Sequence, residues 1–447
     1  MTKLDKFNLY DTIVGVAAPT GGSISIIRMS GSDALDILGQ VFVCKEAEFE
    51  SHRVYYGWIV EDGKRVDEVL ATVMLAPRTF TRQNVVEINC HGGALVTQKV
   101  LSLLIAQGAR LAEAGEFTKR AFLAGRIDLS CAEAVMDIIQ AGSDLAHKAA
   151  ISQLSGRLSG LLDTCTDNLL NQLARIEMAI DYPDHEEAEI LSADIKAGLE
   201  EVLSQIDRLL STASQGRVIR EGIKTAIVGR PNAGKSSLLN ALVGHQRAIV
   251  THVAGTTRDV LRETIDIGGV FLTLSDTAGI RHTDDIVEAE GVARSQQEAE
   301  SADLVLLVVD GSDSALHQLE DAENWRNVIT VVNKCDLPQK THIADAVQVS
   351  AKNHEGIEEL KIKIKEIFAI NKIEYEQEIV TNARHVVLLQ NARVSLVAAI
   401  DAANVDEFVD MVAIDIQSTL VALGEITGAT VDEDLINKIF SEFCLGK

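Results

Sequence analysis

Residues 229–237, GRPNAGKSS, have the composition and spacing of a loop that binds nucleotide phosphates. The segment fits the pattern G-x-x-x-x-G-K-[ST] and follows an apolar run at 226–228, so it lies between an expected strand and an expected helix. Backbone N–H groups of such a loop surround phosphates at the N-terminus of the helix. In this arrangement Lys235 reaches the β- and γ-phosphates and Ser236 ligates Mg²⁺. An ordinary glycine turn is the alternative, and the strand–loop–helix context disfavours it.

Three further segments follow in chain order, each at the end of an expected strand. In DTAG (276–279), Asp276 can hold Mg²⁺ through water and the amide of Gly279 can contact the γ-phosphate. In NKCD (333–336), Asp336 can accept both N1–H and N2–H of guanine, a pair of donors that adenine lacks. SAK (350–352) offers the Ala351 amide to guanine O6. Because ligands of open α/β sheets bind at the strand ends, these four elements predict a site for GTP or GDP.

The residue after DTAG raises a chemical question. Many GTPases place a glutamine there to orient the attacking water, but this chain has Ile280, whose side chain makes no hydrogen bond. GTTRD (255–259) is the candidate switch segment, in which Thr257 can complete the Mg²⁺ shell when the γ-phosphate is present. Hydrolysis therefore needs another group to do the work of the glutamine.

The elements that must position these residues are expected in three regions, each with its own sequence pattern. Residues 1–124 mix strand-like and helical runs and are expected to form an α+β domain. Residues 125–216 and 380–447 carry apolar residues at three- and four-residue steps, which predicts amphipathic helices. Residues 217–379 alternate strands with helices, which predicts a parallel sheet covered on both faces. We therefore expect a multidomain chain in which an α/β P-loop G domain is inserted between two parts of one helical domain.

Composition restricts the partners. The 447 residues carry a formal net charge of −25, whereas a protein that holds nucleic acid by itself usually presents a basic face. Six scattered cysteines without a C-x-x-C pair argue against zinc and disulfides and for a reducing cytoplasm. No apolar run approaches the roughly 20 residues of a membrane span, and the first residues have no apolar signal region.

Several motifs together resemble a known family. They are the P-loop Asn232, the GTTRD switch, CHGG (90–93), GEFTKRAFLAGRIDL (115–129) and the terminal CLGK (444–447). This set is similar to the bacterial tRNA-modification GTPases called MnmE or TrmE, and the resemblance covers the whole chain.

The resemblance implies an activity and partners. With a FAD-dependent partner, such proteins install an aminomethyl-type group (carboxymethylaminomethyl) at carbon 5 of the wobble uridine in certain tRNAs. A tetrahydrofolate derivative, the 5,10-methylene or 5-formyl form, is the one-carbon source. The resemblance further implies a homodimer made by the N-terminal domain, which is similar to folate-binding domains. It also implies an α2β2 heterotetramer with the flavoprotein and tRNA contact mainly through that partner.

The resemblance also assigns folate ligands. They are Arg28 in SIIRMSG, Glu87 in VVEINCHGG, Arg126 in AGRIDL and Lys447. Cys444 lines the same site or acts as a nucleophile in uridine activation, and the lining role is preferred because nothing nearby in the sequence activates the thiol. One turn departs from the family pattern Thr-Gly-Glu-Asp, since this chain reads TRQN at 81–84.

For the Ile280 question, the resemblance implies a K⁺ ion in place of a glutamine or arginine finger. Asn232 supplies a side-chain oxygen to K⁺, and Thr251, Val253 and Thr256 supply carbonyls. Glu288 orients the water through a second water, although it is alternatively part of a solvated acidic helix face. The GTP-binding residues expected from motifs and resemblance are Asn232, Ala233, Gly234, Lys235, Ser236, Ser237, Thr251, Thr256, Thr257, Asp276, Thr277, Ala278, Gly279, Asn333, Lys334, Asp336, Ser350, Ala351 and Lys352.

Two other classes of function compete with this one. A GTP-dependent switch in ribosome assembly can also carry a P-loop asparagine and DTAG, but it usually needs a basic RNA-binding module such as a KH domain. The acidic region after residue 369 has no G-x-x-G loop of that kind. A stand-alone folate enzyme with a regulatory G domain is the other alternative, and it would not need a flavoprotein.

Overall fold

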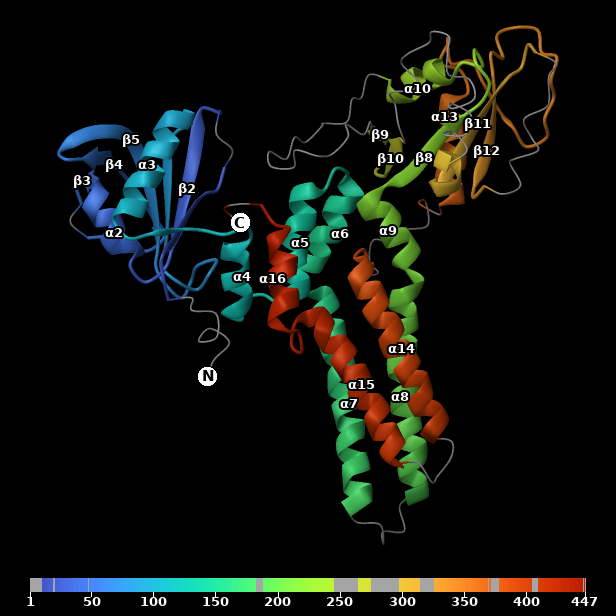
Figure 1. The fold of residues 1–447 in the computed structure, drawn as a ribbon. Coiled ribbons are helices and arrows are strands. Elements are labelled where there is room, and N and C mark those ends of the chain that lie inside the picture. The colour runs from blue at the N-terminus through green and yellow to red at the C-terminus, as the bar shows by residue number, and fades with distance from the viewer. Residues whose placement is uncertain are drawn as a thin grey trace. The chain divides into compact units, whose positions relative to one another are not determined.

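The computed structural model describes most of the chain and divides it into two compact units. The first unit is Met1–Met136 with Gly424–Lys447, and the second is Asp137–Leu423. The described residues are 10–18, 21–46, 48–181, 188–244, 264–274, 297–313, 325–368, 370, 378–403, 409–444 and 446. Figure 1 shows the course of the chain, with the two termini both in the first unit.

A seven-stranded sheet forms the centre of the first unit. Its strand order is β3-β4-β5-β6-β2-β1-β7, and neighbours are antiparallel except for β1 and β7. Buried and exposed residues alternate along the strands, as in a sheet with one covered face. The strands are β1 (Ile13–Val16), β2 (Ile24–Ser30), β3 (Phe42–Cys44), β4 (Arg53–Glu61), β5 (Lys64–Met74), β6 (Val85–His91) and β7 (Arg110–Leu111).

Helices complete the first unit. The buried residues of α2 and α3 join those of the strands in one apolar core, which places these two helices on one face of the sheet. The last helix of the chain returns to the first unit, where Phe440 contacts Phe122 of α4 with ring centroids 6.2 Å apart. The helices are α2 (Ala34–Val41), α3 (Ala94–Ala106), α4 (Glu116–Leu123) and α16 (Glu433–Ser441).

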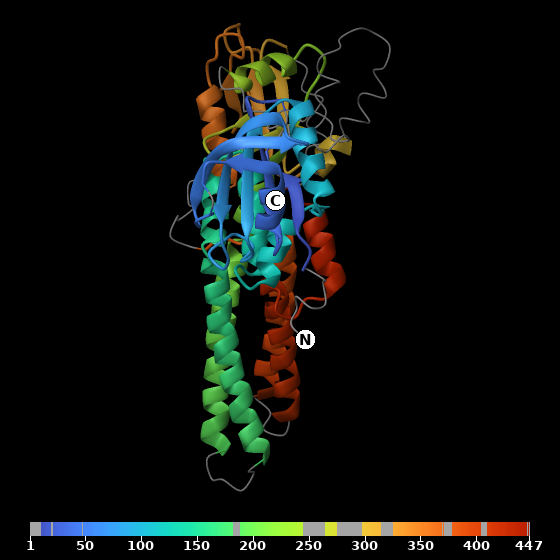
Figure 2. The same cartoon turned by 90° about the vertical axis from the view of Figure 1, so that its left-hand side faces the viewer.

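Helices from two distant parts of the chain make one bundle. Both views show α7 and α8, which precede the G domain, running beside α14 and α15, which follow it (Figures 1 and 2). Residues at helical spacing such as Leu199, Ile206 and Leu396 are fully buried and form its core. The helices are α5 (Leu129–Gln140), α6 (Asp144–Leu154), α7 (Arg157–Asp181), α8 (Ala188–Ser211), α9 (Ala213–Glu221), α14 (Ala383–Ala403) and α15 (Val409–Thr427).

Within the described ranges, α14 is the one helix long and apolar enough to suit a membrane span by length and composition. Leu389, Ala392 and Leu396 on this helix are buried in the protein. The core helix of a bundle passes the same test, so the helix is weak evidence for a membrane span.

The inserted domain is built on a six-stranded sheet with the order β13-β12-β11-β8-β10-β9. All pairs are parallel except β9 with β10. β11 reads LVLLVVD and is buried over its first five residues, as expected for a parallel strand with both faces covered. The elements are β8 (Ile223–Val228), α10 (Lys235–Val243), β9 (Thr264–Asp266), β10 (Phe271–Leu274), β11 (Leu304–Asp310), β12 (Val328–Asn333), β13 (Val347–Val349) and α13 (Ile357–Ile367).

This architecture confirms the fold class expected from the sequence: an α+β N-terminal part, a helical part and an inserted α/β domain. It also fixes where the motifs lie. β8 is followed by the P-loop, β12 by NKCD and β13 by SAK. Because parallel strands end at the same edge of a sheet, these three loops meet there.

Candidate functional site

The P-loop folds around the ammonium group of Lys235. Lys235 Nζ donates hydrogen bonds to the carbonyls of Gly229 (2.7 Å) and Arg230 (2.9 Å). Gly234, the N-cap of α10, has φ +94, and a Cβ there would lie 2.1 Å from the side-chain amide of Asn333. Burial lowers the pKa of Lys235 from its ordinary value. A phosphate at this helix N-terminus would meet both the ammonium group and backbone N–H groups of the first turn.

Asn333 connects the three loops of the site. Its side chain is 2% exposed, its Nδ2 donates to the Ala233 carbonyl (3.0 Å), and its Oδ1 accepts from the Ala351 N–H (3.1 Å). The P-loop, NKCD and SAK are therefore held at a fixed spacing. The Ala351 N–H, which we expected to meet guanine O6, donates to Asn333, so a contact with O6 requires a shared hydrogen bond.

The carboxylate expected to recognise guanine is oriented by a neighbouring loop. Ser350 Oγ donates to Asp336 Oδ1 at 2.8 Å. Lys334 has φ +65, and its ammonium group pairs with Asp310 at the end of β11. The structure thus brings together Asn333, Lys334, Asp336 and the SAK loop at one edge of the sheet. Asn232, Ser236, Ser237 and Lys352 are exposed at the same edge, while Ala233 is buried.

The remaining predicted nucleotide and K⁺ ligands lie outside the described residues. These are Thr251, Val253, Thr256, Thr257, Asp276, Thr277, Ala278, Gly279 and Glu288, together with Ile280. Lys447 also lies outside them.

In the first unit, two of the predicted folate ligands form an ion pair. Arg28 of β2 and Glu87 of β6 are direct partners in the antiparallel register, and Arg28 Nη2 lies 2.7 Å from Glu87 Oε1. Arg28 Nη1 also donates to the carbonyl of Gly446 at 3.2 Å. The carbonyl of Cys444 accepts from the Gly115 N–H at 3.3 Å. Gly446 of the C-terminal motif therefore lies beside the Arg28–Glu87 pair.

Arg126 lies near the same aromatic cluster as Arg28. The Arg126 guanidinium is 4.8 Å from the centroid of the Phe80 ring, and that of Arg28 is 5.7 Å from the centroid of Phe117. Phe80 packs against the small cluster that contains Phe117. Two guanidinium groups and one carboxylate thus border one apolar platform. Such a set can hold a planar heterocycle that carries carboxylates.

In the TRQN turn, the neutral side-chain amides of Gln83 and Asn84 accept hydrogen bonds. Gln83 Oε1 accepts from Ser30 Oγ (3.0 Å) and from Arg120 Nη1 (3.2 Å). Asn84 Oδ1 accepts from the Ala76 N–H (3.0 Å). Arg82 has φ +60, in the left-handed region that favours the glycine of the family pattern. The departure therefore changes charge and backbone strain at this turn, while Glu87 keeps its place on β6.

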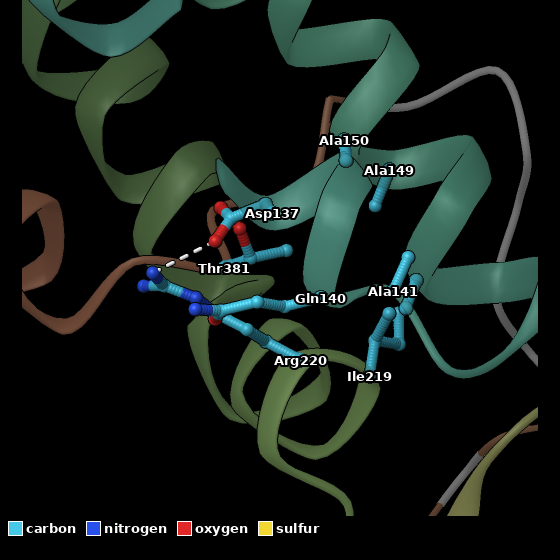
Figure 3. Close-up of a pocket in the computed structure, with 9 residues that line it drawn as sticks. Asp137, Gln140, Ala141, Ala149, Ala150, Ile219, Arg220 and Thr381 are labelled. Atoms are coloured by element: carbon cyan, nitrogen blue, oxygen red, sulfur yellow. Dashed lines mark ion pairs between the residues drawn. The ribbon is translucent and has the colours of Figure 1, made fainter. Parts of the chain in front are cut away.

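A small cavity lies among helices of the second unit (Figure 3). Its volume is about 30 Å³, and α5, α6 and α9 supply most of its walls. Asp137 Oδ1 pairs with Arg220 Nη2 across it at 2.8 Å. This volume suits a water molecule and no larger ligand. The cavity therefore belongs to the packing between α5, α6 and α9.

Sequence reasoning missed Asp310, which contacts the guanine loop. The available signal was its place directly after the buried run LVLLVV, at the same sheet edge as the motifs. It also missed Asp67, whose buried carboxylate accepts from the Nδ1 and N–H of His91 in CHGG (2.7 and 2.9 Å). No local pattern marks that second pair, because β5 and β6 bring it together.

In the comparisons with known proteins, two family models match successive parts of the chain. The family description "GTP-binding protein TrmE N-terminus" matches residues 12–126, and "MnmE helical domain" matches residues 129–444. The tRNA modification GTPase MnmE of Lactococcus lactis subsp. cremoris (strain SK11) is 47% identical, covering 98% of this chain and 99% of the relative. That of Bacillus cereus (strain ATCC 14579) is also 47% identical, covering 98% and 100%. The G domain of the T. maritima FeoB iron transporter is 28% identical over a match that covers 33% of this chain and 98% of that structure. The TM-score of this match is 0.25, and no inference is drawn from it.

Proposed function

This chain belongs to the family of the tRNA modification GTPase MnmE, and on that premise we propose that it is a K⁺-dependent GTPase that acts with a FAD-dependent partner. As a member of the family it is a GTP-hydrolysing enzyme of tRNA modification. The proposed reaction adds an aminomethyl-type group (carboxymethylaminomethyl) at carbon 5 of the wobble uridine of certain tRNAs. The observation that carries this proposal is the hydrogen bond from Arg28, the ion-pair partner of Glu87, to the carbonyl of Gly446.

We assign the G domain's described residues as follows. Lys235 binds the β- and γ-phosphates, since its ammonium group is already held inside the P-loop by two carbonyls. Ser236 is the second residue of α10, in its first turn, and is assigned to ligate Mg²⁺. Asp336 accepts from the guanine edge, and Ser350 holds its carboxylate in orientation. Thr257, Asp276 and Gly279 complete the Mg²⁺ and γ-phosphate contacts in this proposal.

For hydrolysis, a K⁺ ion would supply the positive charge that an arginine finger supplies elsewhere, which is worth about 10³–10⁵ in rate. Asn232 is exposed in the P-loop with φ +63, so its amide oxygen is available at the mouth of the phosphate site. Thr251, Val253 and Thr256 provide the remaining oxygens. Glu288 orients the attacking water, the task that Ile280 leaves open.

The first unit offers the chemistry of a reduced-folate site. Arg28 and Arg126 can bind carboxylates, Glu87 can accept from the amino groups of the pterin, and the partly buried Phe80 ring can contact the heterocycle. Lys447 follows directly after Gly446, whose carbonyl accepts from Arg28. In this proposal Cys444 lines the site. The bound tetrahydrofolate derivative would supply the one-carbon unit.

The uncovered parts of the N-terminal sheet support a homodimer. Large apolar side chains are exposed on β2, β3, β4 and β5: Ile24, Val43, Val54, Tyr56 and Leu70. An exposed apolar patch of this kind favours burial against another protein surface. A second copy of this domain is the proposed occupant.

The net charge of −25 supports binding of tRNA through a partner protein, because an acidic surface repels the phosphates of RNA. We propose that tRNA is held mainly by the flavoprotein in an α2β2 assembly. All six cysteines are thiols, which supports a cytoplasmic location.

The experiment that tests the proposal compares GTP hydrolysis in KCl and in NaCl at equal ionic strength. Faster turnover in K⁺ is expected, because Na⁺ is smaller and fits a ring of protein oxygens made for K⁺ poorly. Equal rates would refute the cation mechanism. A second assay measures modification of tRNA by the chain alone and with its flavoprotein, and activity of the chain alone would favour a stand-alone folate enzyme.

A further inference from the structure

The loop after β11 is fastened to the loop that carries NKCD. β11 and β12 are parallel neighbours, and Asp310 is the register partner of Asn333. Asp310 Oδ1 accepts from the N–H (2.9 Å) and Oγ (2.7 Å) of Ser312, which closes its own loop. Asp310 Oδ2 lies 2.5 Å from Lys334 Nζ. The two carboxylate oxygens therefore have separate tasks, one within the loop and one across to Lys334.

Lys334 is also held by its backbone. Its carbonyl accepts from Gln339 Nε2 at 2.9 Å, and the same amide group donates to the Leu337 carbonyl at 2.8 Å. Gln339 fits against Gly311, where a Cβ would lie 2.0 Å from Gln339 Oε1. The residue after Asp310 thus leaves space for the side chain that braces the Lys334 carbonyl. The ammonium group of Lys334 is thus held by Asp310 and its carbonyl by Gln339, from two loops that pack together at Gly311.

The charge of Asp310 is present at neutral pH. Burial raises the pKa of its carboxyl group, but hydrogen bonds from Lys334 and Ser312 outweigh burial and hold the pKa below its ordinary value. The pair is partly exposed, with 32% of the Lys334 and 21% of the Asp310 side chain accessible. Its effect on affinity is therefore modest, because water screens an exposed ion pair.

We propose that Asp310 is a positioning residue for guanine recognition: it anchors the ammonium group of Lys334 so that the methylene stem of Lys334 covers one face of the base. This role of Asp310 rests on the proposed contact of Lys334 with the base and is independent of K⁺, folate and tRNA. A lysine side chain has many rotamers, and ordering it before binding removes part of the entropy that binding otherwise costs. Asp310 itself does not touch the nucleotide in this proposal.

The test uses the full chain and fluorescent GDP. Asp310→Asn keeps an oxygen for Ser312 and removes the charge that Lys334 meets. We expect affinity for GDP and for a non-hydrolysable GTP analogue to fall by the same factor, about fivefold, since the contact is with the base and not the γ-phosphate. The KM for GTP should rise correspondingly while kcat changes less than twofold. Asp313→Asn, an exposed acid in the same loop, is the matched control and should bind like the wild type.

A double-mutant cycle shows whether Asp310 acts through Lys334. In a Lys334→Met background, which retains the stem without the charge, Asp310→Asn should cause no further loss of affinity. An equal loss in both backgrounds would overturn the proposal, and so would wild-type affinity in Asp310→Asn alone. If Asp310→Asn lowers the thermal midpoint, Asp310→Glu decides: it keeps the charge and should recover most of the affinity. The ratio of GTPase rates in K⁺ and Na⁺ should be unchanged in Asp310→Asn, which separates this test from that of the cation mechanism.

Discussion

Replacing Gly446 by alanine should release the C-terminal segment from its site. Gly446 has φ +86, and a Cβ there would lie 2.2 Å from the carbonyl oxygen of Val16. Val16 is paired with Ile27 in the sheet, so this carbonyl has little freedom to move. An alanine at position 446 therefore has no room while the segment remains docked.

The size of the effect follows from two contributions. The left-handed conformation costs a residue with a Cβ about 1–2 kcal/mol. The contact with the Val16 carbonyl oxygen adds repulsion that only undocking relieves, whereas the hydrogen bond from Arg28 Nη1 to the Gly446 carbonyl (3.2 Å) favours the docked segment in both forms and drops out of the comparison. The backbone strain alone shifts the equilibrium roughly 5- to 30-fold toward the undocked segment, at about 1.4 kcal/mol per tenfold.

Two assays separate undocking from ligand binding. The rate at which carboxypeptidase B removes Lys447 reports how often the C-terminus is free, and it should rise in Gly446→Ala. Calorimetry with 5-formyltetrahydrofolate should show weaker binding, as it should for a chain that lacks residues 444–447. Affinity for GTP should be unchanged, because the nucleotide loops belong to the second unit.

Gly108→Ala is the matched control. Gly108 has φ +110 in the same unit, and no atom lies within 4 Å of the position of its Cβ. This variant carries a similar backbone strain without a clash near the C-terminus, so Lys447 should be released at the wild-type rate. Wild-type release in Gly446→Ala would refute the reasoning from the Val16 contact. Fast release with normal folate affinity would instead remove the C-terminus from the folate site.

Three further outcomes are expected. Asp336→Asn should weaken GTP binding and improve binding of xanthosine triphosphate, because one donor–acceptor relationship between residue 336 and the base is inverted. Titration of both nucleotides checks this. An unchanged preference for GTP would remove Asp336 from the base site. Asn232→Ala should lose most of the K⁺ advantage in GTP hydrolysis, whereas Glu288→Ala should slow hydrolysis with nucleotide binding intact, as rate and binding assays in the two salts will show. The chain alone should bind tRNA weakly at about 150 mM salt, where counterions compete for the phosphates, and much more tightly once the flavoprotein is added; tight binding without it in a filter or mobility assay would reveal a local basic surface.

The nucleotide loops could be predicted from the sequence because each has a local signal. A run of buried apolar residues marks a parallel strand, and the polar residues that follow it must lie at the common edge of the sheet. This reasoning placed Lys235, Asn333 and Asp336 together without any knowledge of distances. It did not show that the Ala351 N–H donates to Asn333, because that bond depends on how two loops pack.

The network around Arg120 had no comparable signal. This side chain is 1% exposed, and its Nη2 donates to Asp11 (2.7 Å) and Glu116 (2.9 Å). Burial raises the pKa of Glu116, but hydrogen bonds from Arg110 and from the Glu113 N–H hold it below its usual value. A buried cation needs several acceptors, and here they come from segments 109 and 37 residues away as well as from the same helix. Only the fold brings such partners together, so the sequence motif GEFTKR does not reveal them.

The contact of β10 with the helical part of the second unit also depends on close packing that no motif announces. Phe271 begins β10, the strand that leads toward DTAG. A Cβ on Gly142, in the loop between α5 and α6, would lie 2.6 Å from the Phe271 ring, and one on Gly222, between α9 and β8, would lie 2.7 Å from its carbonyl oxygen. Two glycines thus let one strand of the G domain rest directly on the helical part of the same unit. Since close-packed contacts have little compressibility, a displacement of β10 must either move the α5–α6 loop with it or open this contact.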